Sequence, residues 1–437
     1  MNEMNKAVKI LFDKSGMVLN VPVNTTVLEG QIVKPCADVE TSVLAALDNP
    51  IGTAPLAQLI MDKKPQTVAI TISDITRPVP NRQFLPAIMQ VLNQNGIADS
   101  QIVIIVGTGM HRASTRQEHE ILVGTDIVNR IEVIDHQADN AKTMLKISKT
   151  PPVSVCKRFA EADFRIVTGF IEAHFMAGFS GGRKGVCPAL VDLETIQDFH
   201  GYHTLANPYA STGNLTNNPC HKISLKVAKK VGVDFLFNVI ISRDKQIASI
   251  YCGNLELAHR KGCRQVKEWM TASFDHQFDL VITNGGGYPL DYTFYQTVKG
   301  MCTALPALSE HTTLLVVSSC HDQIGSEAYT ELMLRYDNDW EKFLLDIGRG
   351  DAETKLDQWQ YQMQAKVLDL IGKDKLCLVT DGIPQDIQKH LSVTPVLGTG
   401  DAQVRTQRFI DEYLSVHPCA RVAIIPDGPY TMLKAAR

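Results

Sequence analysis

Short runs of aliphatic and β-branched residues alternate with helical stretches along most of this chain, and this alternation limits the folds that it can adopt. The runs are continuous and do not alternate with polar residues, as strands buried on both faces require. They lie at 67–72, 101–106, 131–134 and 164–169, and again at 279–283, 313–317 and 376–380. The pattern predicts parallel sheets covered by helices on both sides.

The alternation is interrupted once. A helix expected at about 255–270 is followed by Thr271-Ala272-Ser273, which we interpret as a polar connector. A chain of 437 residues also exceeds one ordinary domain of about 150 residues. We therefore expect two α/β domains with largely parallel sheets and an active-site cleft between them. The first would span 1–275 and the second 276–411, and the last strand, in 412–437, could complete either domain.

Composition excludes several classes of protein. The 43 basic and 47 acidic residues give a formal charge of −4, so neither nucleic acid nor a membrane surface is an expected partner. No stretch reaches the roughly 18 apolar residues of a membrane helix, and residues 1–6 have no signal-peptide core. The ten cysteines form no CxxC pair, which argues against a zinc ribbon. Reduced thiols in a cytoplasmic protein are the simplest expectation.

Residues able to do chemistry follow the ends of several expected strands. Asp74, Thr76 and Arg77 follow the first strand, His111 follows the second and His174 the fourth. Ligands bind at the carboxyl ends of parallel strands, so these residues are candidates for one site. Arginine suits bidentate recognition of a carboxylate, and Arg77 stands beside a stiffening proline.

A glycine-rich segment follows His174. Gly178 to Lys184 is neither a P-loop nor a dinucleotide fingerprint, because Lys184 is preceded by Arg183 and followed by Gly185. The small residues Gly181 and Gly182 beside two cations would suit a phosphate. A turn with solvated charges explains the segment equally well.

Each histidine also has two interpretations. His111 and His174 could be two bases facing one site, or they could be structural. His200 ends a helix expected at about 192–200. It could bind a metal there, or it could stabilise the helix C-terminus through its interaction with the helix dipole. Farther along, Gln296 and Lys299 share a helix face near Tyr295, although such a pair seen alone is more often part of an ordinary surface.

Taken together, these motifs resemble the lactate racemase family, whose members use a nickel-pincer nucleotide. The resemblance rests on Asp74-Ile75-Thr76-Arg77-Pro78, on Gly107 to Arg112, on His174 to Lys184, on His200 and on Tyr295-Gln296-x-x-Lys299. The segment from His174 to Lys184 is its most specific part. One departure follows Lys184, where this chain has Gly185-Val186-Cys187-Pro188-Ala189 in place of the usual Ser and Pro-Gly pair.

The resemblance implies a cofactor and a role for each residue. The cofactor is pyridinium-3-thioamide-5-thiocarboxylic acid mononucleotide with nickel, attached covalently to the position of Lys184, and His200 matches the nickel ligand. His111 and His174 match the acid/base pair. The substrate side is matched by Arg77, Tyr295, Gln296 and Lys299, and the nucleotide side by Asp74, Thr76, Gly181, Gly182 and Arg183. The partners implied are a small 2-hydroxy acid and the enzymes that assemble the cofactor.

These roles predict a reaction. The α-hydrogen of a 2-hydroxy acid is not acidic enough for histidine to remove as a proton, but it can leave as hydride while a histidine takes the hydroxyl proton. The 2-keto acid that results is planar, and return of hydride to its other face inverts C2. Two bases, His111 and His174, favour a racemase or epimerase over a dehydrogenase, which needs one. The alternatives are a zinc hydrolase that uses His111, His174 and His200, and a non-catalytic nickel- or nucleotide-binding protein.

Overall fold

The computed structural model describes residues 5–350 and 352–436, and the chain divides into two compact units. The central unit comprises Ile32–His200 and Tyr209–Trp269. The terminal unit comprises the residues up to Gln31, the short segment Gly201–Pro208 and the residues from Met270 onward. Both units are α/β structures built on largely parallel sheets, which confirms the expected fold class. The domain boundary expected at 275/276 lies close to Met270, where the terminal unit resumes. The residues up to Gln31 were expected in the first domain, but they belong to the terminal unit.

The central unit is organised around a six-stranded sheet of order β13-β12-β9-β4-β5-β6. All neighbours pair in parallel except β12 and β13, which are antiparallel. The six strands are β4 Val68–Ser73, β5 Ile102–Gly107, β6 Glu132–Asp135, β9 Phe164–Phe170, β12 Phe235–Ile241 and β13 Ile247–Gly253. The first four coincide closely with the runs seen in the sequence.

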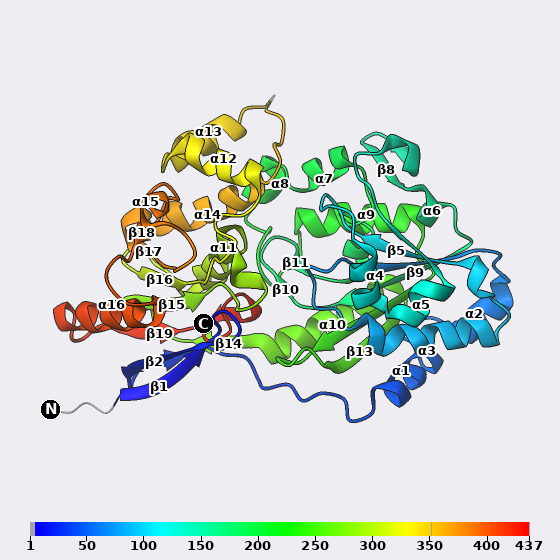
Figure 1. Ribbon diagram of the computed structural model, residues 1–437, viewed down its shortest axis with the longest axis horizontal. Helices are drawn as coiled ribbons and strands as arrows, with labels where there is room; N and C mark the ends of the chain where they lie inside the picture. The colour runs from blue at the N-terminus through cyan, green and yellow to red at the C-terminus, as the bar shows by residue number, and fades with distance from the viewer. Residues whose placement is uncertain (1–4, 351, 437) are drawn as a thin grey trace. The chain divides into compact units, whose positions relative to one another are not determined.

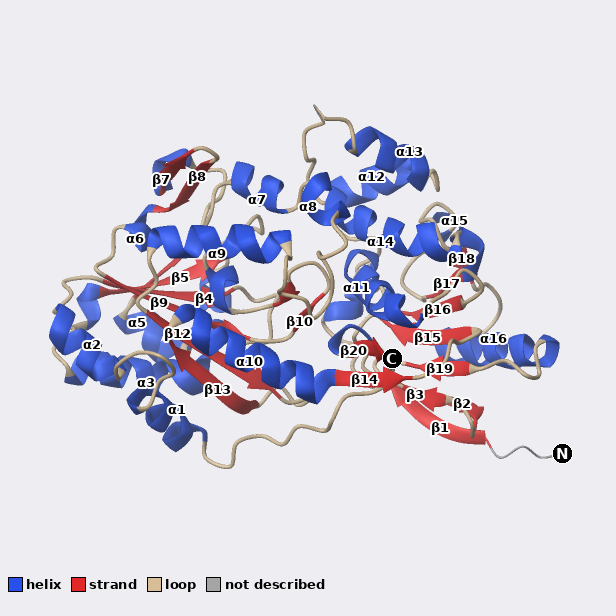
Figure 2. Cartoon of the chain, turned by 180° about the vertical axis from the view of Figure 1, so that it is seen from behind, coloured by secondary structure: helices blue, strands red, loops and turns tan. Residues whose placement is uncertain are grey.

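Helices cover both faces of this sheet (Figures 1 and 2). One face carries α1 Val39–Asp48, α2 Leu56–Lys63 and α3 Asn81–Gln94, and α9 Pro219–Val231 lies on the other. The remaining helices of the unit are α4 Arg116–Val123, α5 Thr125–Arg130, α6 Lys157–Ala160, α7 Leu193–Phe199 and α10 Leu255–Met270, with the 3₁₀ turns η1 Asp99–Gln101, η2 Ala141–Thr143 and η3 Gly182–Gly185. Two hairpins complete it, β7 Met144–Lys149 with β8 Pro152–Cys156, and β10 Ala173–His174 with β11 Gly178–Phe179.

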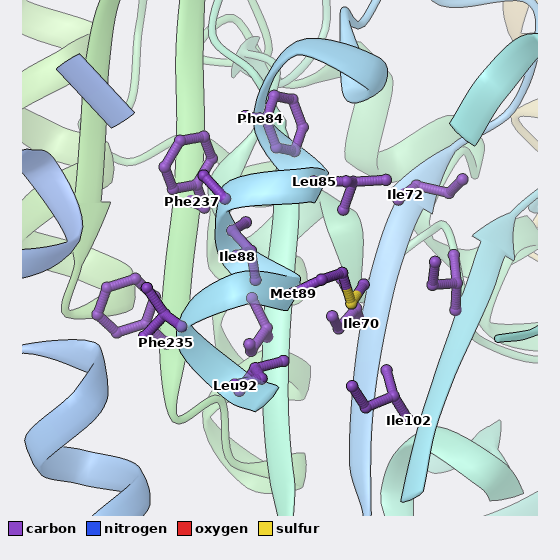
Figure 3. Packing of buried hydrophobic residues seen from close by; sticks show 14 of the residues in the cluster. Ile70, Ile72, Phe84, Leu85, Ile88, Met89, Leu92, Ile102, Phe235 and Phe237 are labelled. Atoms are coloured by element: carbon purple, nitrogen blue, oxygen red, sulfur yellow. The ribbon is translucent and has the colours of Figure 1, made fainter. Parts of the chain in front are cut away.

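The core between α3 and the sheet follows directly from the helical spacing of apolar residues (Figure 3). Phe84, Ile88 and Leu92 are fully buried and recur on one face of α3. The ring of Phe84 lies 4.8 Å from that of Phe237 on β12, measured between centroids. Burying such side chains contributes on the order of 1.5–3 kcal/mol each, which fixes the sheet that carries the site.

The order of strands creates a switch point in the central sheet. From β4 the chain proceeds to β5 and β6 on one side, and later returns to place β9 on the other side of β4. Loops leaving β4 and β9 therefore diverge at their carboxyl ends, which is where open parallel sheets bind ligands.

The terminal unit contains a second six-stranded sheet of order β18-β17-β16-β15-β19-β3, with every neighbouring pair parallel. Its strands are β3 Thr26–Val27, β15 Leu280–Asn284, β16 Thr313–Val317, β17 Leu376–Val379, β18 Thr394–Pro395 and β19 Val422–Ile424. The last expected strand is therefore β19, and it lies between β15 and β3. A hairpin of β1 Asn5–Ile10 and β2 Met17–Pro22 packs its buried side chains into the same core.

Two expectations are wrong in detail in this unit. The polar connector expected at Thr271 is strand β14 Thr271–Phe274, because it pairs in parallel with β20 Met432–Ala435 near the other end of the chain. The segment from 337 to 371, whose mixed polar and apolar sequence predicts helix throughout, instead forms two separate helices, α13 Trp340–Ile347 and α14 Gln358–Ile371. The other helices are α8 Tyr202–Ala206, α11 Phe294–Ala304, α12 Glu327–Tyr336, α15 Gln385–Gln388 and α16 Ala402–Val416, with η4 Leu290–Tyr292, η5 Leu305–Ala307, η6 Lys373–Lys375 and η7 Gly428–Tyr430.

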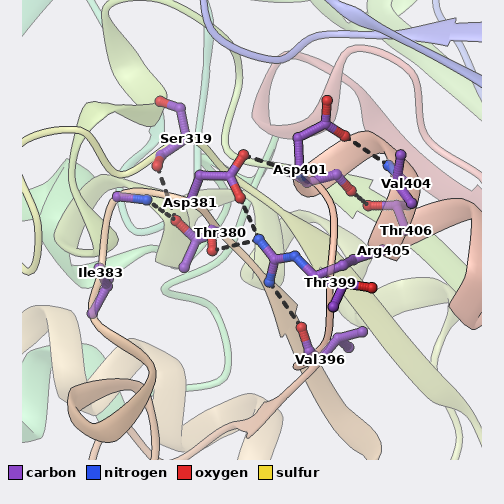
Figure 4. A network of polar contacts seen from close by, with 12 residues as sticks. Ser319, Thr380, Asp381, Ile383, Val396, Thr399, Asp401, Val404, Arg405 and Thr406 are labelled. Carbon is purple, nitrogen blue, oxygen red and sulfur yellow. Dashed lines mark hydrogen bonds and ion pairs between the residues drawn. The ribbon is translucent and has the colours of Figure 1, made fainter.

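A buried arginine closes the carboxyl end of β17 (Figure 4). Arg405 of α16 pairs with Asp381 and donates to the carbonyl oxygens of Thr380, at 3.0 Å, and Val396, at 2.9 Å. Asp381 in turn accepts the amide of Ala402 at the start of α16. The guanidinium of Arg405 thus has a structural role, and its hydrogen bonds hold the carboxyl end of β17 rigid.

Two observations bear on the expected environment. No helix within the described part of the chain is long and apolar enough to cross a bilayer. The cysteines that the structure describes are all free thiols.

Candidate active site

Lys184 lies at the switch point of the central sheet. The 3₁₀ turn η3 that carries it rests against both strands of the switch, because a β-carbon on Gly185 would stand 2.5 Å from Cγ1 of Val167 on β9 and 3.4 Å from Oγ1 of Thr71 on β4. Only glycine permits this close approach of the loop to the sheet. The lysine that the resemblance singles out therefore stands where an α/β sheet binds its ligand.

The neighbouring Arg183 is buried and does not face solvent. It is 1% exposed, and its guanidinium donates to the carbonyl oxygens of Ala177 at 2.7 Å, Phe179 at 2.8 Å and Gly181 at 3.3 Å. Burial lowers the pKa of Arg183 to about 10, so it stays charged at neutral pH. The structure gives Arg183 the task of shaping the glycine-rich loop, whereas the sequence suggested contact with a nucleotide.

The glycines of this loop make room for two residues that no motif indicated. Gly182 has a φ of +56°, and a β-carbon there would stand 2.5 Å from the ring of His259 on α10. A β-carbon on Gly181 would stand 2.6 Å from Oδ1 of Asn238 on β12. That oxygen accepts the amide of Gly182 at 2.7 Å. The amide therefore points into the protein, which argues against the phosphate cradle that the sequence suggested at this position.

Asp74, at the end of β4, links two of the expected site residues. Its Oδ2 accepts a hydrogen bond from Nδ1 of His111 at 2.5 Å, and its Oδ1 accepts one from Oγ1 of Thr76 at 2.6 Å. Burial raises the pKa of Asp74, but the hydrogen bond from His111 and the charges of His111 and Arg77 outweigh it and hold the pKa below its ordinary value. Asp74 is thus an ionised acceptor at neutral pH.

His174 lies in the tight hairpin of β10 and β11 that follows β9. Its Nδ1 accepts hydrogen bonds from the amides of Met176 and Ala177, both at 3.2 Å. The ring stacks on Phe175, with 5.2 Å between centroids. His111 follows β5 and His174 follows β9, so the two expected bases come from opposite sides of β4 at the same edge of the sheet.

His200 caps the C-terminus of α7 and is held in one tautomer. Its Nδ1 donates to the carbonyl oxygen of Ile196 at 2.9 Å, which leaves the lone pair on Nε2. Burial, and to a smaller extent the positive charge of Lys184, lowers the pKa of His200 to about 3. A neutral imidazole with an Nε2 lone pair is the form that binds a metal ion.

The remaining expected residues lie on α11 of the terminal unit. Tyr295, Gln296 and Lys299 are half-buried in its first turns. The hydroxyl of Tyr295 accepts Nε1 of Trp359 at 2.8 Å. Gln296 has a buried Oε1 with no hydrogen-bond partner among the residues that the structure describes. An acceptor in that state indicates a missing donor, because burial without a hydrogen bond is costly.

A multidentate metal site was the alternative expectation for the histidines. Within residues 5–350 and 352–436, no three His, Cys, Asp or Glu side chains converge closely enough to hold a metal ion. The structure therefore does not support a zinc site built from His111, His174 and His200.

Comparison with known proteins gives a consistent result. Residues 12–213 match the family model described as the lactate racemase N-terminal domain, and residues 274–432 match the lactate racemase C-terminal domain. The chain is 34% identical to a lactate racemase of Thermoanaerobacterium thermosaccharolyticum over 392 residues, which is 89% of each chain. It is also 34% identical to a lactate racemase of Lactiplantibacillus plantarum over 398 residues, 90% of this chain and 91% of that one.

Solved structures extend the comparison to the fold. The lactate racemase apoprotein from T. thermosaccharolyticum superposes with a TM-score of 0.86 at 33% identity, over 98% of this chain and 100% of that one. A crystal structure of a protein from Thermotoga maritima superposes with a TM-score of 0.68 at 17% identity, over 94% and 100% of the two chains. The second likeness shows a shared fold alone.

Proposed function

The chain belongs to the lactate racemase family and is an isomerase of the racemase class, and on that premise we propose that it inverts C2 of lactate or a closely related 2-hydroxy acid. The observation that carries the proposal is the placement of His111 and His174. They follow two strands that flank β4 at one sheet edge, and a reaction that inverts a centre needs a base on each side.

The chain's own residues would bind and orient the acid. Arg77 is half-buried beside Asp74 and is suited to pairing with the substrate carboxylate. On α11, Gln296, Tyr295 and Lys299 would contact the substrate, as the family resemblance implies. In this proposal the terminal unit supplies substrate contacts and the central unit supplies the bases.

The residues of the central unit fit the nickel-pincer nucleotide. His200 offers a neutral Nε2 donor, because burial, with a smaller contribution from the charge of Lys184, lowers its pKa to about 3. Nickel(II) accepts an imidazole beside soft sulfur donors. Lys184 would carry the group covalently and His200 would ligate the metal, while the buried Oγ1 of Thr71, which has no hydrogen-bond partner among the described residues, lies under η3. When bound, the group supplies an acceptor for the hydride that no side chain of the protein can provide.

The protonic part of the reaction falls to the histidines. In one direction His111 takes the proton of the substrate hydroxyl, and the imidazolium is stabilised by the Asp74 carboxylate at 2.5 Å. A 2-keto acid then stands between the two rings. For the other enantiomer, whose hydride leaves from the opposite face, His174 takes the hydroxyl proton and gives it back in the reverse reaction.

Covalent attachment is the feature of this proposal that a single measurement can test. The full chain would be produced together with the enzymes that assemble the cofactor, and its intact mass measured as wild type, Lys184→Ala and Lys222→Ala. Lys222 is an exposed lysine of α9 and is the matched control. We expect a cofactor-sized mass increase in the wild type and the control, and none in Lys184→Ala.

Activity is measured separately, by chiral chromatography of D- and L-lactate and of longer 2-hydroxy acids. Conversion in both directions by the loaded wild type is expected. A mass increase that survives in Lys184→Ala would refute the attachment, and a loaded enzyme that interconverts no 2-hydroxy acid would refute the function.

A further inference from the structure

The two histidines of the candidate site have opposite hydrogen-bond partners at Nδ1. The partner of His111 is the Oδ2 atom of Asp74, at 2.5 Å. An ionised carboxylate can only accept, so Nδ1 of His111 carries the proton and the lone pair of the neutral ring is on Nε2.

His174 shows the reverse arrangement. The groups that reach its Nδ1 are the backbone amides of Met176 and Ala177, both at 3.2 Å. Backbone amides can only donate, so Nδ1 of His174 holds the lone pair. The neutral ring therefore carries its proton on Nε2.

The surroundings keep both arrangements in place. Asp74 is 8% exposed at its side chain, and its second oxygen is occupied by the hydroxyl of Thr76, so the carboxylate cannot turn away from His111. The amides at 176 and 177 belong to the turn that joins β10 to β11, where His174 pairs with Gly178. A β-carbon on Gly178 would stand 2.1 Å from the carbonyl oxygen of Asn214, so the turn is confined from outside.

We propose that Asp74 and the amides of Met176 and Ala177 are positioning groups that hold His111 and His174 in opposite tautomers. At rest, Nε2 of His111 presents a lone pair and Nε2 of His174 presents a proton. The inference rests on the proposed function for its catalytic meaning, but the tautomers themselves are properties of the chain.

The consequence is a directional resting state. When a substrate hydroxyl faces His111, its O–H bond breaks, an N–H bond forms at Nε2, and the positive ring faces Asp74. When the hydroxyl faces His174, Nε2 already carries a proton. The ring must first move that proton to Nδ1 and give up both amide bonds. Hydroxyl deprotonation should therefore be faster for the enantiomer that faces His111.

Nuclear magnetic resonance of the full chain, labelled with ¹⁵N in the histidine rings, tests the proposal directly. The protonated and unprotonated ring nitrogens differ widely in chemical shift, and single histidine replacements assign the signals. Two other rings are internal references. His136 donates from Nε2 to the carbonyl oxygen of Val191 at 2.9 Å, and His200 donates from Nδ1 to that of Ile196.

At neutral pH we expect His111 to match the pattern of His200, and His174 to match that of His136. Two rings in the same tautomer, or a doubly protonated His174, would overturn the proposal. The wild-type spectrum carries this test, and the histidine replacements serve only to assign its signals. It also separates the inference from the function, since racemase activity with equal tautomers would refute the inference alone.

A pair of variants tests the part played by Asp74. Asp74→Asn offers an amide donor to Nδ1 of His111 and should move its proton to Nε2, with kcat reduced on the order of 10²–10⁴-fold and KM little changed. Asp74→Glu should restore the original tautomer. The matched control is Asp135→Asn, since Asp135 contacts Nε2 of His119 at 2.8 Å. It should alter the signals of His119 and leave the His111 tautomer unchanged. A His111 tautomer that survives Asp74→Asn would refute the role of Asp74.

Discussion

Replacing Gly182 by alanine tests how the glycine-rich loop supports Lys184. Gly182 has a φ of +56°, and an L-residue in the left-handed region loses roughly 1–2 kcal/mol. The new β-carbon would also stand 2.5 Å from the ring of His259. Relieving such overpacking typically costs about 1–3 kcal/mol. The sum predicts a loss of roughly 2–5 kcal/mol in the free energy of unfolding of the central unit.

The ring of His259 has little freedom to move aside. It is 2% exposed, and its Nε2 lies 2.9 Å from the carbonyl oxygen of Ser180 and 3.1 Å from Nη1 of Arg183. Displacing the ring therefore disturbs the guanidinium that holds the carbonyl oxygens of the loop. We expect the variant to load less cofactor on Lys184 as well as to unfold more easily.

Gly96→Ala is the matched control. Gly96 lies in the same unit with a φ of +88°, and a β-carbon there meets no atom within 4 Å. It carries the backbone cost of roughly 1–2 kcal/mol without the steric one. Urea unfolding, checked by calorimetry, compares the stability of the two variants. Intact mass gives their cofactor loading. Equal destabilisation by Gly182→Ala and Gly96→Ala, with equal loading, would refute the reasoning.

Two further predictions concern substrate binding and the stability of the protein at low pH. Arg77→Lys keeps the charge but loses the bidentate fork, so kcat/KM should fall by the equivalent of about 1–3 kcal/mol with the unfolding transition unchanged; an unaltered kcat/KM for every active 2-hydroxy acid would exclude the carboxylate role. Burial, aided by the charge of Arg183, lowers the pKa of His221 to about 4. Between pH about 6.5 and 4, His221 is therefore protonated in the unfolded state and neutral in the folded state. As the pH falls through this range, the free energy of unfolding should decrease by up to about 1.4 kcal/mol per pH unit. His221→Leu should remove that part of the slope in urea unfolding, whereas His311→Gln, at a side chain 82% exposed, should not; identical slopes in both would contradict the assignment.

The sequence predicts most of what depends on local pattern. The strands that flank the site, β4, β5 and β9, are continuous apolar runs, and the glycines and charges after them stand out. The pattern fails where pairing partners are far apart in the chain. Strand β14 has a polar sequence and becomes a strand because β20 pairs with it from near the C-terminus.

The details of the candidate site were less predictable. Arg183 beside Lys184 looks like a second cation for an anionic ligand, yet tertiary packing buries it under α10 with backbone carbonyls as its partners. His259 and Asn238 belong to no motif, and the one available indication was a single amide within the apolar run of β12. Asp74 was expected near the nucleotide because of its motif. Its contact with His111 depends on the register of β4 against β5, which the sequence alone does not contain.

Both sheets have a switch point, but their edges differ in chemistry. In the terminal unit the switch lies between β15 and β19. Asn284 fills it, because Nδ2 donates to the carbonyl oxygens of Ile425 and Pro426 and Oδ1 accepts the amide of Gly286. A β-carbon on Gly428 would stand 2.4 Å from that Oδ1. A ligand could enter between these strands only by displacing a fully buried amide whose hydrogen bonds are satisfied, at a cost of several kcal/mol.

The corresponding place in the central sheet is occupied by the turn that carries Lys184, with Asp74 and His111 at the neighbouring strand ends. Polar groups there stay ionised or hold a defined tautomer, as a reaction that moves protons requires. The same topology thus serves structure in one unit and chemistry in the other. The difference arises from a few residues at the strand ends: a buried asparagine closes one switch point, and glycines let a lysine-bearing turn approach the other. This is why we assign the proposed bases to the central unit.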